Sequence, residues 1–349
     1  MKLVDNMAHA YEYDNTNTVH WHNRALDETH GKVYAELLKG IFPDAEGKAC
    51  LDIACGTGVF LAHLAKQGAV AIGIDASPSI LQTAESYLRE QGLEVLRRSS
   101  PLEVKIDSSL KGKVQLVSGD MFTLGASGLP PCEYATWAFP YLGFDSKDLS
   151  FLRRLNQAFL EAIPATMTRN GYAHKSGIAR EVFVNRRDLM RGRDERGFPT
   201  YALGERRLPD DFFDVTPYGQ ANIDLYLQVL ARMNWTHITQ LATISASHRL
   251  VFEEVYKVLR PGGCYILATY GAKTARQAAD KDYDKGFCQN QFMGEQSPRR
   301  EYMLMRAEFI PLGIDMAQEQ NDVDKTSKVP EGYDTGVYLV DVRVEKTSL

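Results

Sequence analysis

The chain has 349 residues, of which 44% are hydrophobic and 24% are charged, and its formal net charge is −5. These values are typical of a globular protein with a sizeable core, and the acidic balance argues against a broad nucleic-acid interface. No apolar stretch has the length needed to cross a bilayer, and the first residues lack the apolar core of a signal peptide. The five cysteines form no C-x-x-C pair and the histidines lack metal-ligand spacing, so we expect a cytoplasmic protein with reduced thiols and no metal site.

The chain begins with a polar and aromatic arm at 1–30, followed by an expected helix at 31–40. From residue 49, short apolar runs that predict buried strands alternate with amphipathic runs that predict helices. The expected strands are 49–54, 70–75, 114–120, 133–139 and 264–270, and the expected helices are 59–68, 77–92 and 248–259. Near the end of the chain, 307–317 and 336–345 are expected to form an antiparallel pair.

This alternation predicts an α/β fold with a doubly wound, mostly parallel sheet covered by helices on both faces. About 100 residues separate the fourth strand from the next helix, where a few would suffice, and they contain helical patterns of their own. We therefore expect an N-terminal arm and helix at 1–44, an α/β domain at 45–144 and 247–349, and an inserted, mainly helical cap at 145–246. A smaller insertion is expected at 93–112.

A glycine-rich turn, LDIACGTG at 51–58, lies between the first strand and the helix that follows it. Small residues there let the backbone approach a ligand closely, and the helix N-terminus offers free N–H groups to it. The alternative is a tight turn that needs glycine for geometry alone. Asp75 ends the second strand, where it can accept both ribose hydroxyls of an adenosine ligand, and Asp120 ends the third, where it can accept the adenine amino group. Because neighbouring parallel strands end on one rim of a sheet, these groups are expected to converge there.

The turn, together with IDAS (74–77), SGDMF (118–122) and VLRPGG (258–263), resembles the class I S-adenosylmethionine (SAM)-dependent methyltransferase family, especially its small-molecule members. The resemblance covers about residues 45–142 and 246–270. It implies a Rossmann-like, seven-stranded sheet with an antiparallel last strand, and SAM as the cofactor. It also implies a set of cofactor-binding residues, with Asp52 at the methionyl amino group: Asp52, Ala54, Cys55, Gly56, Gly58, Asp75, Ala76, Ser77, Gly119, Asp120, Met121 and Ala138.

Two departures from the family pattern are visible. Ala54 replaces the usual first glycine of the turn, and the spacing from Asp75 to Asp120 is longer than usual. A nicotinamide-dependent dehydrogenase is the rival for a glycine-rich turn, but it requires G-x-G-x-x-G, and Leu61 stands where the third small residue would be.

The fourth expected strand ends in WAFPY (137–141), a stretch that passes beside the SAM sulfonium in the family. Members that methylate nucleic-acid bases carry Asn or Asp followed by Pro-Pro-Tyr there. Ala138 and Phe139 supply no acceptor for an exocyclic amine, which argues against base methylation. Phe139 and Tyr141 can stabilise a sulfonium by cation–π attraction, or they can simply be core residues, as we interpret Trp137.

The arm and the cap supply further candidates. Tyr13 and Trp21 can close over the cofactor as a lid, or they can pack on the cap. Tyr172 lies in a polar cluster of the cap that can hold a carboxylate substrate, or this cluster can be solvated surface. The candidate catalytic residues are therefore Phe139, Tyr141 and Tyr172, and Tyr13 and Trp21 join the candidate cofactor residues.

Three functions fit these patterns. The first is methylation of a small molecule at N, O or C. The second is SAM consumption without an acceptor, in which the amino group of SAM attacks its own side chain to give azetidine-2-carboxylate and methylthioadenosine. The third is non-catalytic SAM binding. The expected partner is a small-molecule substrate, or SAM alone, with no nucleic acid or membrane, and the chain is expected to be a monomer or homodimer.

Overall fold

The computed structural model describes residues 15–41, 45–139, 192–193, 199–200, 248–293, 302–312 and 333–344. The chain forms two compact units. The larger unit comprises Glu12–Tyr141, Val251–Cys288 and Ser297–Leu349, and the smaller comprises Met1–Tyr11, Leu142–Leu250 and Gln289–Gln296. The expected cap at 145–246 lies outside the described residues, apart from the short antiparallel strands β6 (Gly192–Arg193) and β7 (Pro199–Thr200).

The larger unit is built on a sheet whose strands follow the order β3-β4-β2-β1-β5-β8-β10-β9. Strands β1 to β5 and β8 pair in parallel, whereas β10 is antiparallel to both of its neighbours. Their bounds are β1 Ala49–Ile53, β2 Val70–Asp75, β3 Val95–Arg98, β4 Val114–Ser118, β5 Cys132–Ala138, β8 Leu259–Thr274, β9 Tyr302–Pro311 and β10 Tyr333–Val344. The expected mostly parallel sheet and its antiparallel C-terminal pair are confirmed.

The predicted strand count of seven is wrong, because the described residues form a sheet of eight strands. The additional strand is β3, which adds to the edge beside β4, inside the segment 93–112 that was expected to be an insertion. Its sequence VLRR places one buried side chain, Val95, beside partly or fully exposed neighbours. An edge strand of this kind lacks the continuous apolar run by which the central strands are recognised.

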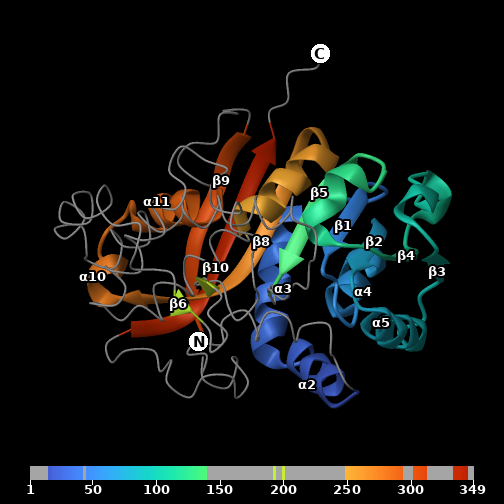
Figure 1. Ribbon diagram of the computed structural model, residues 1–349, viewed down its shortest axis with the longest axis horizontal. Helices are drawn as coiled ribbons and strands as arrows, with labels where there is room; N and C mark the ends of the chain where they lie inside the picture. The colour runs from blue at the N-terminus through green and yellow to red at the C-terminus, as the bar shows by residue number, and fades with distance from the viewer. Residues whose placement is uncertain are drawn as a thin grey trace. The chain divides into compact units, whose positions relative to one another are not determined.

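Helices cover both faces of the sheet. On one face, α3, α4 and α5 contribute buried side chains to the same cluster as Cys50 of β1 and Ile266 of β8. On the other face, the helix at 248–258 places Phe252 with its ring centroid 5.9 Å from that of Tyr265 of β8. Figure 1 shows α4 and α5 beside β1, β2 and β4. The helix bounds are α2 Asn15–Ala25, α3 Glu28–Ile41, α4 Val59–Lys66, α5 Pro78–Glu90, α10 Ala275–Ala278 and α11 Tyr283–Cys288.

The helix α2 was not expected within the arm. Its sequence NTNTVHWHNRA has few apolar residues, so no helical periodicity identifies it. The expected helix at 31–40 is confirmed as α3, and the helix after β2 begins as its sequence predicts. Ser77 accepts a hydrogen bond from the Ile80 N–H at 3.3 Å, and Pro78 occupies the first helical position of α5.

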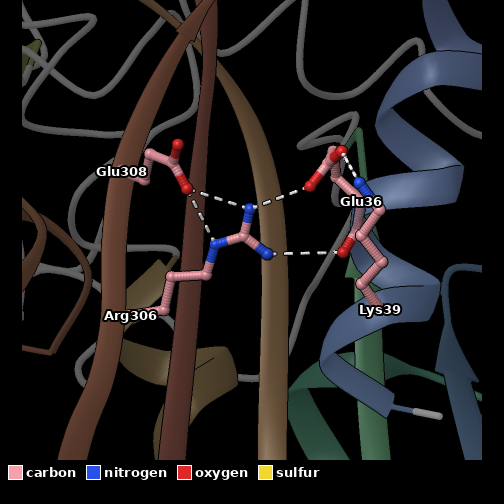
Figure 2. Close-up of polar contacts among 4 residues, drawn as sticks. All are labelled: Glu36, Lys39, Arg306 and Glu308. Atoms are coloured by element: carbon pink, nitrogen blue, oxygen red, sulfur yellow. Dashed lines mark hydrogen bonds and ion pairs between the residues drawn. The ribbon is translucent and has the colours of Figure 1, made fainter. Parts of the chain in front are cut away.

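The antiparallel side of the sheet is joined to α3 by one arginine, shown in Figure 2. Arg306 of β9 places Nη2 at 3.4 Å from Glu36 Oε2 and 3.0 Å from Glu308 Oε2, and its Nη1 donates to the Glu36 carbonyl at 3.3 Å. Glu36 also pairs with Lys39 at 2.5 Å. The guanidinium therefore satisfies two carboxylates and a backbone acceptor where α3 meets the strand.

Beside this arginine, Asp341 of β10 is a partly exposed acid in an unfavourable place. It lies opposite Arg306 of β9 in the strand register. Its side chain also lies close to Gly40 of α3, where an added Cβ would be 3.1 Å from Asp341 Oδ2. Among the described residues, Oδ1 of this carboxylate is buried without a hydrogen-bond partner. Burial raises the pKa of Asp341 to about 6, although the Arg306 charge opposes the rise.

Candidate functional site

The carboxyl ends of β4, β2, β1 and β5 lie on one rim, because these strands are adjacent and parallel. Backbone hydrogen bonds connect the loops that leave this rim. The Cys55 N–H donates to the Ile74 carbonyl at 3.0 Å, and the Gly119 N–H donates to the Asp75 carbonyl at 3.0 Å. The glycine-rich turn, the end of β2 and the end of β4 are thereby held together. The chain order reverses between β1 and β5, which is where open α/β sheets bind ligands.

Left-handed backbone shapes the glycine-rich turn. The φ angles are +49° at Ala54, +54° at Gly56 and +80° at Gly58. A Cβ at Gly56 would meet no atom within 4 Å, so the turn is open there, whereas one at Gly58 would meet Leu88 of α5 at 3.2 Å. Ala54 is a non-glycine residue at positive φ, which costs conformational energy and is a feature found at functional sites. Its backbone conformation also explains why the family usually has glycine there.

Asp75 connects the glycine-rich turn to the loop that follows β2. Its Oδ2 accepts the Gly56 N–H at 3.0 Å, and its Oδ1 accepts the Ser77 N–H at 2.9 Å. Burial raises the pKa of this carboxyl, while hydrogen bonds from the backbone of Ser77, Gly56 and Ala76 oppose the rise. A carboxylate offers about four acceptor positions, so both oxygens retain capacity for ligand hydroxyls.

Asp52 lies deeper in the sheet, on β1. Asp52 is 2% exposed. The Thr136 hydroxyl of β5 donates a hydrogen bond to Asp52 Oδ1, with an oxygen–oxygen distance of 2.9 Å. Burial raises the pKa of Asp52 to about 7; the Thr136 hydrogen bond lowers it and the Asp75 charge raises it. The sequence interpretation missed Thr136, although a polar residue inside a buried strand is a signal that can draw attention to it.

At the end of β4, Asp120 accepts the Phe122 N–H at 2.9 Å through Oδ1 and caps the short helix η4 (Met121–Ala126). Burial raises the pKa of Asp120; the Phe122 hydrogen bond lowers it and the Glu254 charge raises it. Met121 is buried, and Gly119 precedes the cap with its Cβ position 2.5 Å from Ile74 Cδ1. These three residues lie at the same rim as Asp75.

At the end of β5, Ala138 is partly buried and Phe139 has a φ of +54°. The Phe139 N–H donates to the Ala268 carbonyl at 2.8 Å. Its ring centroid lies 4.2 Å from that of His30 and 5.8 Å from that of Tyr34, both on α3. Trp137 is completely buried, as its interpretation as a core residue predicts.

The helix α2 contacts the glycine-rich turn through His22. Its Nδ1 lies 2.9 Å from Thr57 Oγ1, and its ring meets that of Tyr87 edge-on at 4.9 Å. Burial lowers the pKa of His22, although the charge of Glu90 opposes the change. The sequence analysis missed this contact, because it depends on the unexpected helix. Of the other predicted site residues, Trp21 lies in α2, but the structure does not describe its side chain. Tyr13, Tyr141 and Tyr172 lie outside the described residues.

Among the described residues, the cysteines and the possible metal ligands give no further site. All five cysteines are free thiols in the structure, and four of them are buried. Burial raises the pKa of Cys132 to about 12 and that of Cys55 well above its usual value, so both remain protonated. Within the described ranges, no group of three His, Cys, Asp or Glu side chains can hold a metal ion. The described helices include none with the length and apolar character required to cross a bilayer.

Part of the chain is similar in sequence to known methyltransferases. Residues 50–108 match a family described as "Methyltransferase domain". Two relatives named "Ubiquinone biosynthesis O-methyltransferase" are each 45% identical to this chain. The one from Methylococcus capsulatus aligns over 62 residues, which is 18% of this chain and 26% of the relative. The one from Pasteurella multocida aligns over 49 residues, or 14% and 20%. The chain therefore matches about a quarter or less of the length of these relatives.

Among solved structures, magnesium protoporphyrin IX methyltransferase from Synechocystis PCC 6803, crystallised with bound SAH, is 10% identical with a TM-score of 0.39. The alignment covers 96% of this chain and 97% of that chain. The family match, rather than this distant likeness, links the α/β part of the chain to methyltransferases. It covers residues 50–108, which include the glycine-rich turn and Asp75.

Proposed function

We propose that this chain is a SAM-dependent methyltransferase that acts on a small-molecule acceptor. The observation that carries the proposal is the position of Asp75, whose two oxygens are held by the Gly56 and Ser77 N–H groups at the end of β2. A carboxylate fixed in this way, beside an open glycine turn, suits the paired hydroxyls of a ribose. Asp120 and the Met121 backbone are proposed for the adenine, and Asp52 for the methionyl ammonium.

The residues present fit this cofactor. The open space above Gly56 lets a ligand approach the backbone closely. Asp52 is a buried acid, and among the described residues its neighbours that affect its pKa are the Thr136 hydroxyl and the Asp75 carboxyl. Such an acid is suited to a cationic group. When bound, SAM supplies a methyl carbon on a sulfonium, which is already a strong electrophile. The protein therefore contributes mainly orientation of the acceptor and exclusion of water.

The aromatic candidates are proposed to perform this second task. Phe139 is fixed by its backbone hydrogen bond to Ala268 and by the neighbouring ring of His30, so it can present a constant surface beside the sulfonium. Tyr141 and Tyr172 are proposed to contact the acceptor, and Tyr13 and Trp21 to cover the cofactor. Without a side-chain acceptor at Ala138, a small metabolite is favoured over a nucleic-acid base.

The relatives suggest which acceptor to test first. Both are named as O-methyltransferases, so a hydroxyl group is the first candidate class. Their similarity covers 62 and 49 residues, which is too little to define an acceptor pocket, and amine and carbon acceptors belong in the same screen.

Mass analysis of nucleoside products tests the proposal. The protein is incubated with SAM alone and then with SAM and a pool of hydroxylated and amino metabolites. We expect S-adenosylhomocysteine only when an acceptor is present, together with a product heavier by one methylene. Methylthioadenosine formed from SAM alone would replace the proposal with intramolecular cyclisation. Tight SAM binding without turnover in any fraction would replace it with a binding protein.

A further inference from the structure

Thr136 and Asp52 form a buried polar pair inside the sheet. The two residues are register partners on the adjacent parallel strands β5 and β1, and they are 0% and 2% exposed. Thr136 Oγ1 lies 2.9 Å from Asp52 Oδ1 and 3.4 Å from the Leu51 carbonyl. The carboxylate is the nearer acceptor and carries the charge, so it is the preferred partner of the hydroxyl hydrogen.

Acidic and neutral groups surround this carboxylate. The charge of Asp75, at the end of the neighbouring strand β2, raises the pKa of Asp52. The Asp52 charge in turn raises the pKa of the Cys50 and Cys55 thiols. Among the described residues, the influences on Asp52 are burial, the Thr136 hydroxyl and Asp75, and none of them is a cation. A buried acid in these surroundings needs a hydrogen-bond donor to stay ionised when no cationic ligand is bound.

We propose that Thr136 is a positioning residue of the cofactor site, whose hydroxyl holds the Asp52 carboxylate in place for the ammonium group of the methionyl part of SAM. The inference rests on the proposed function. Thr136 does not touch the ligand in this account; it acts through Asp52. The neighbouring Leu51 carbonyl gives the hydroxyl a second acceptor when the carboxyl is protonated.

The proposal has a pH signature. An ammonium ligand binds the ionised carboxylate, so its affinity rises with pH until Asp52 is fully ionised and then levels off. Loss of the hydroxyl removes a group that favours the charged form, so the midpoint of this rise moves to higher pH. The expected shift is about one to two pH units, because a hydrogen bond to a charged group has that range of strength.

Calorimetry with two ligands tests this signature between pH 5.5 and 8.5. S-adenosylhomocysteine carries the ammonium group, and methylthioadenosine shares the adenosine part but lacks it. For the wild-type protein, we expect the affinity for S-adenosylhomocysteine to rise with pH and that for methylthioadenosine to stay constant. Thr136→Val should weaken S-adenosylhomocysteine about tenfold or more well below the midpoint, and leave methylthioadenosine unchanged. Thr136→Ser, which keeps the hydroxyl, should behave as wild type.

The other outcomes separate the possible failures. A Thr136→Val protein with lower thermal stability but an unshifted midpoint would overturn the inference and leave Thr136 a structural residue. If the Thr136→Val protein does not fold, Thr136→Ala replaces it. The alanine also lacks the hydroxyl, and it is too small to overfill the site. Asp52→Asn should abolish the pH dependence, and its persistence would overturn the inference as well. A wild-type protein that binds neither ligand would instead contradict the proposed function.

Discussion

The two sides of the sheet hold their carboxylates in different ways. On the parallel side, Asp75 accepts backbone N–H groups from two loops. On the antiparallel side, Glu36 and Glu308 pair with one arginine, and Asp341 retains a buried oxygen without a partner among the described residues. Backbone donors fix a carboxylate while leaving its charge uncompensated, whereas an arginine neutralises it. The first arrangement is suited to binding a polar ligand, and the second to joining a helix to a strand.

The largest expected effect separates these two sides. Asp75→Ala should weaken SAM binding by about 100-fold or more, because two backbone donors lose their acceptor and the proposed ribose contacts disappear. Calorimetry with SAM measures the change. Glu308→Ala removes a carboxylate of the antiparallel side and is the matched control, for which unchanged affinity is expected. Equal losses in both variants would show that the difference between the sides has no functional meaning.

The partly buried acid Asp341 of β10 gives the next effect. The pKa of Asp341 is raised to about 6, so the folded state binds more protons than the unfolded state between about pH 4 and 6. The free energy of unfolding therefore falls as the pH rises through this range. Asp341→Asn should remove this dependence and stabilise the protein by about 1–2 kcal/mol above pH 6. Urea unfolding at pH 4.5 and 7.5 measures it, and a variant less stable than wild type at pH 7.5 would contradict the account.

The arginine itself should affect stability alone. Arg306→Gln removes the cation that Glu36 and Glu308 share and leaves Glu36 paired with Lys39, so we expect a loss of about 1 kcal/mol in the free energy of unfolding. Since the pairs are partly exposed, 0.5 M salt should reduce the difference from wild type. SAM affinity should remain unchanged, and a tenfold loss of affinity would show that this side of the sheet influences the cofactor rim.

The smallest effect concerns the contact between α2 and the glycine turn. His22→Ala removes the hydrogen bond to Thr57 and the ring contact with Tyr87. We expect SAM affinity to fall about threefold to tenfold, which corresponds to the loss of one ordinary hydrogen bond. Val19→Ala, on the exposed surface of α2, is the control. If this control weakens SAM binding as much as His22→Ala does, His22 has no particular role.

The sequence predicts the central strands of the sheet better than the edge strand and the contacts between distant segments, for physical reasons. Central strands are continuous apolar runs, and the acids that end them stand out. Three other features depend on information that local patterns do not contain. β3 is an edge strand with one buried side chain, and α2 is a polar helix that contacts the turn through His22. The partnership of Asp52 with Thr136 depends on the register of strands 84 residues apart in the chain.

We infer that SAM binds the rim formed by the glycine turn and the ends of β2 and β4. Hydrogen–deuterium exchange with and without S-adenosylhomocysteine tests this inference. We expect slower exchange at 54–58, 75–77 and 119–122, with no change at 302–312 and 333–344. Protection confined to the antiparallel strands, or binding without protection of the glycine turn, would contradict it.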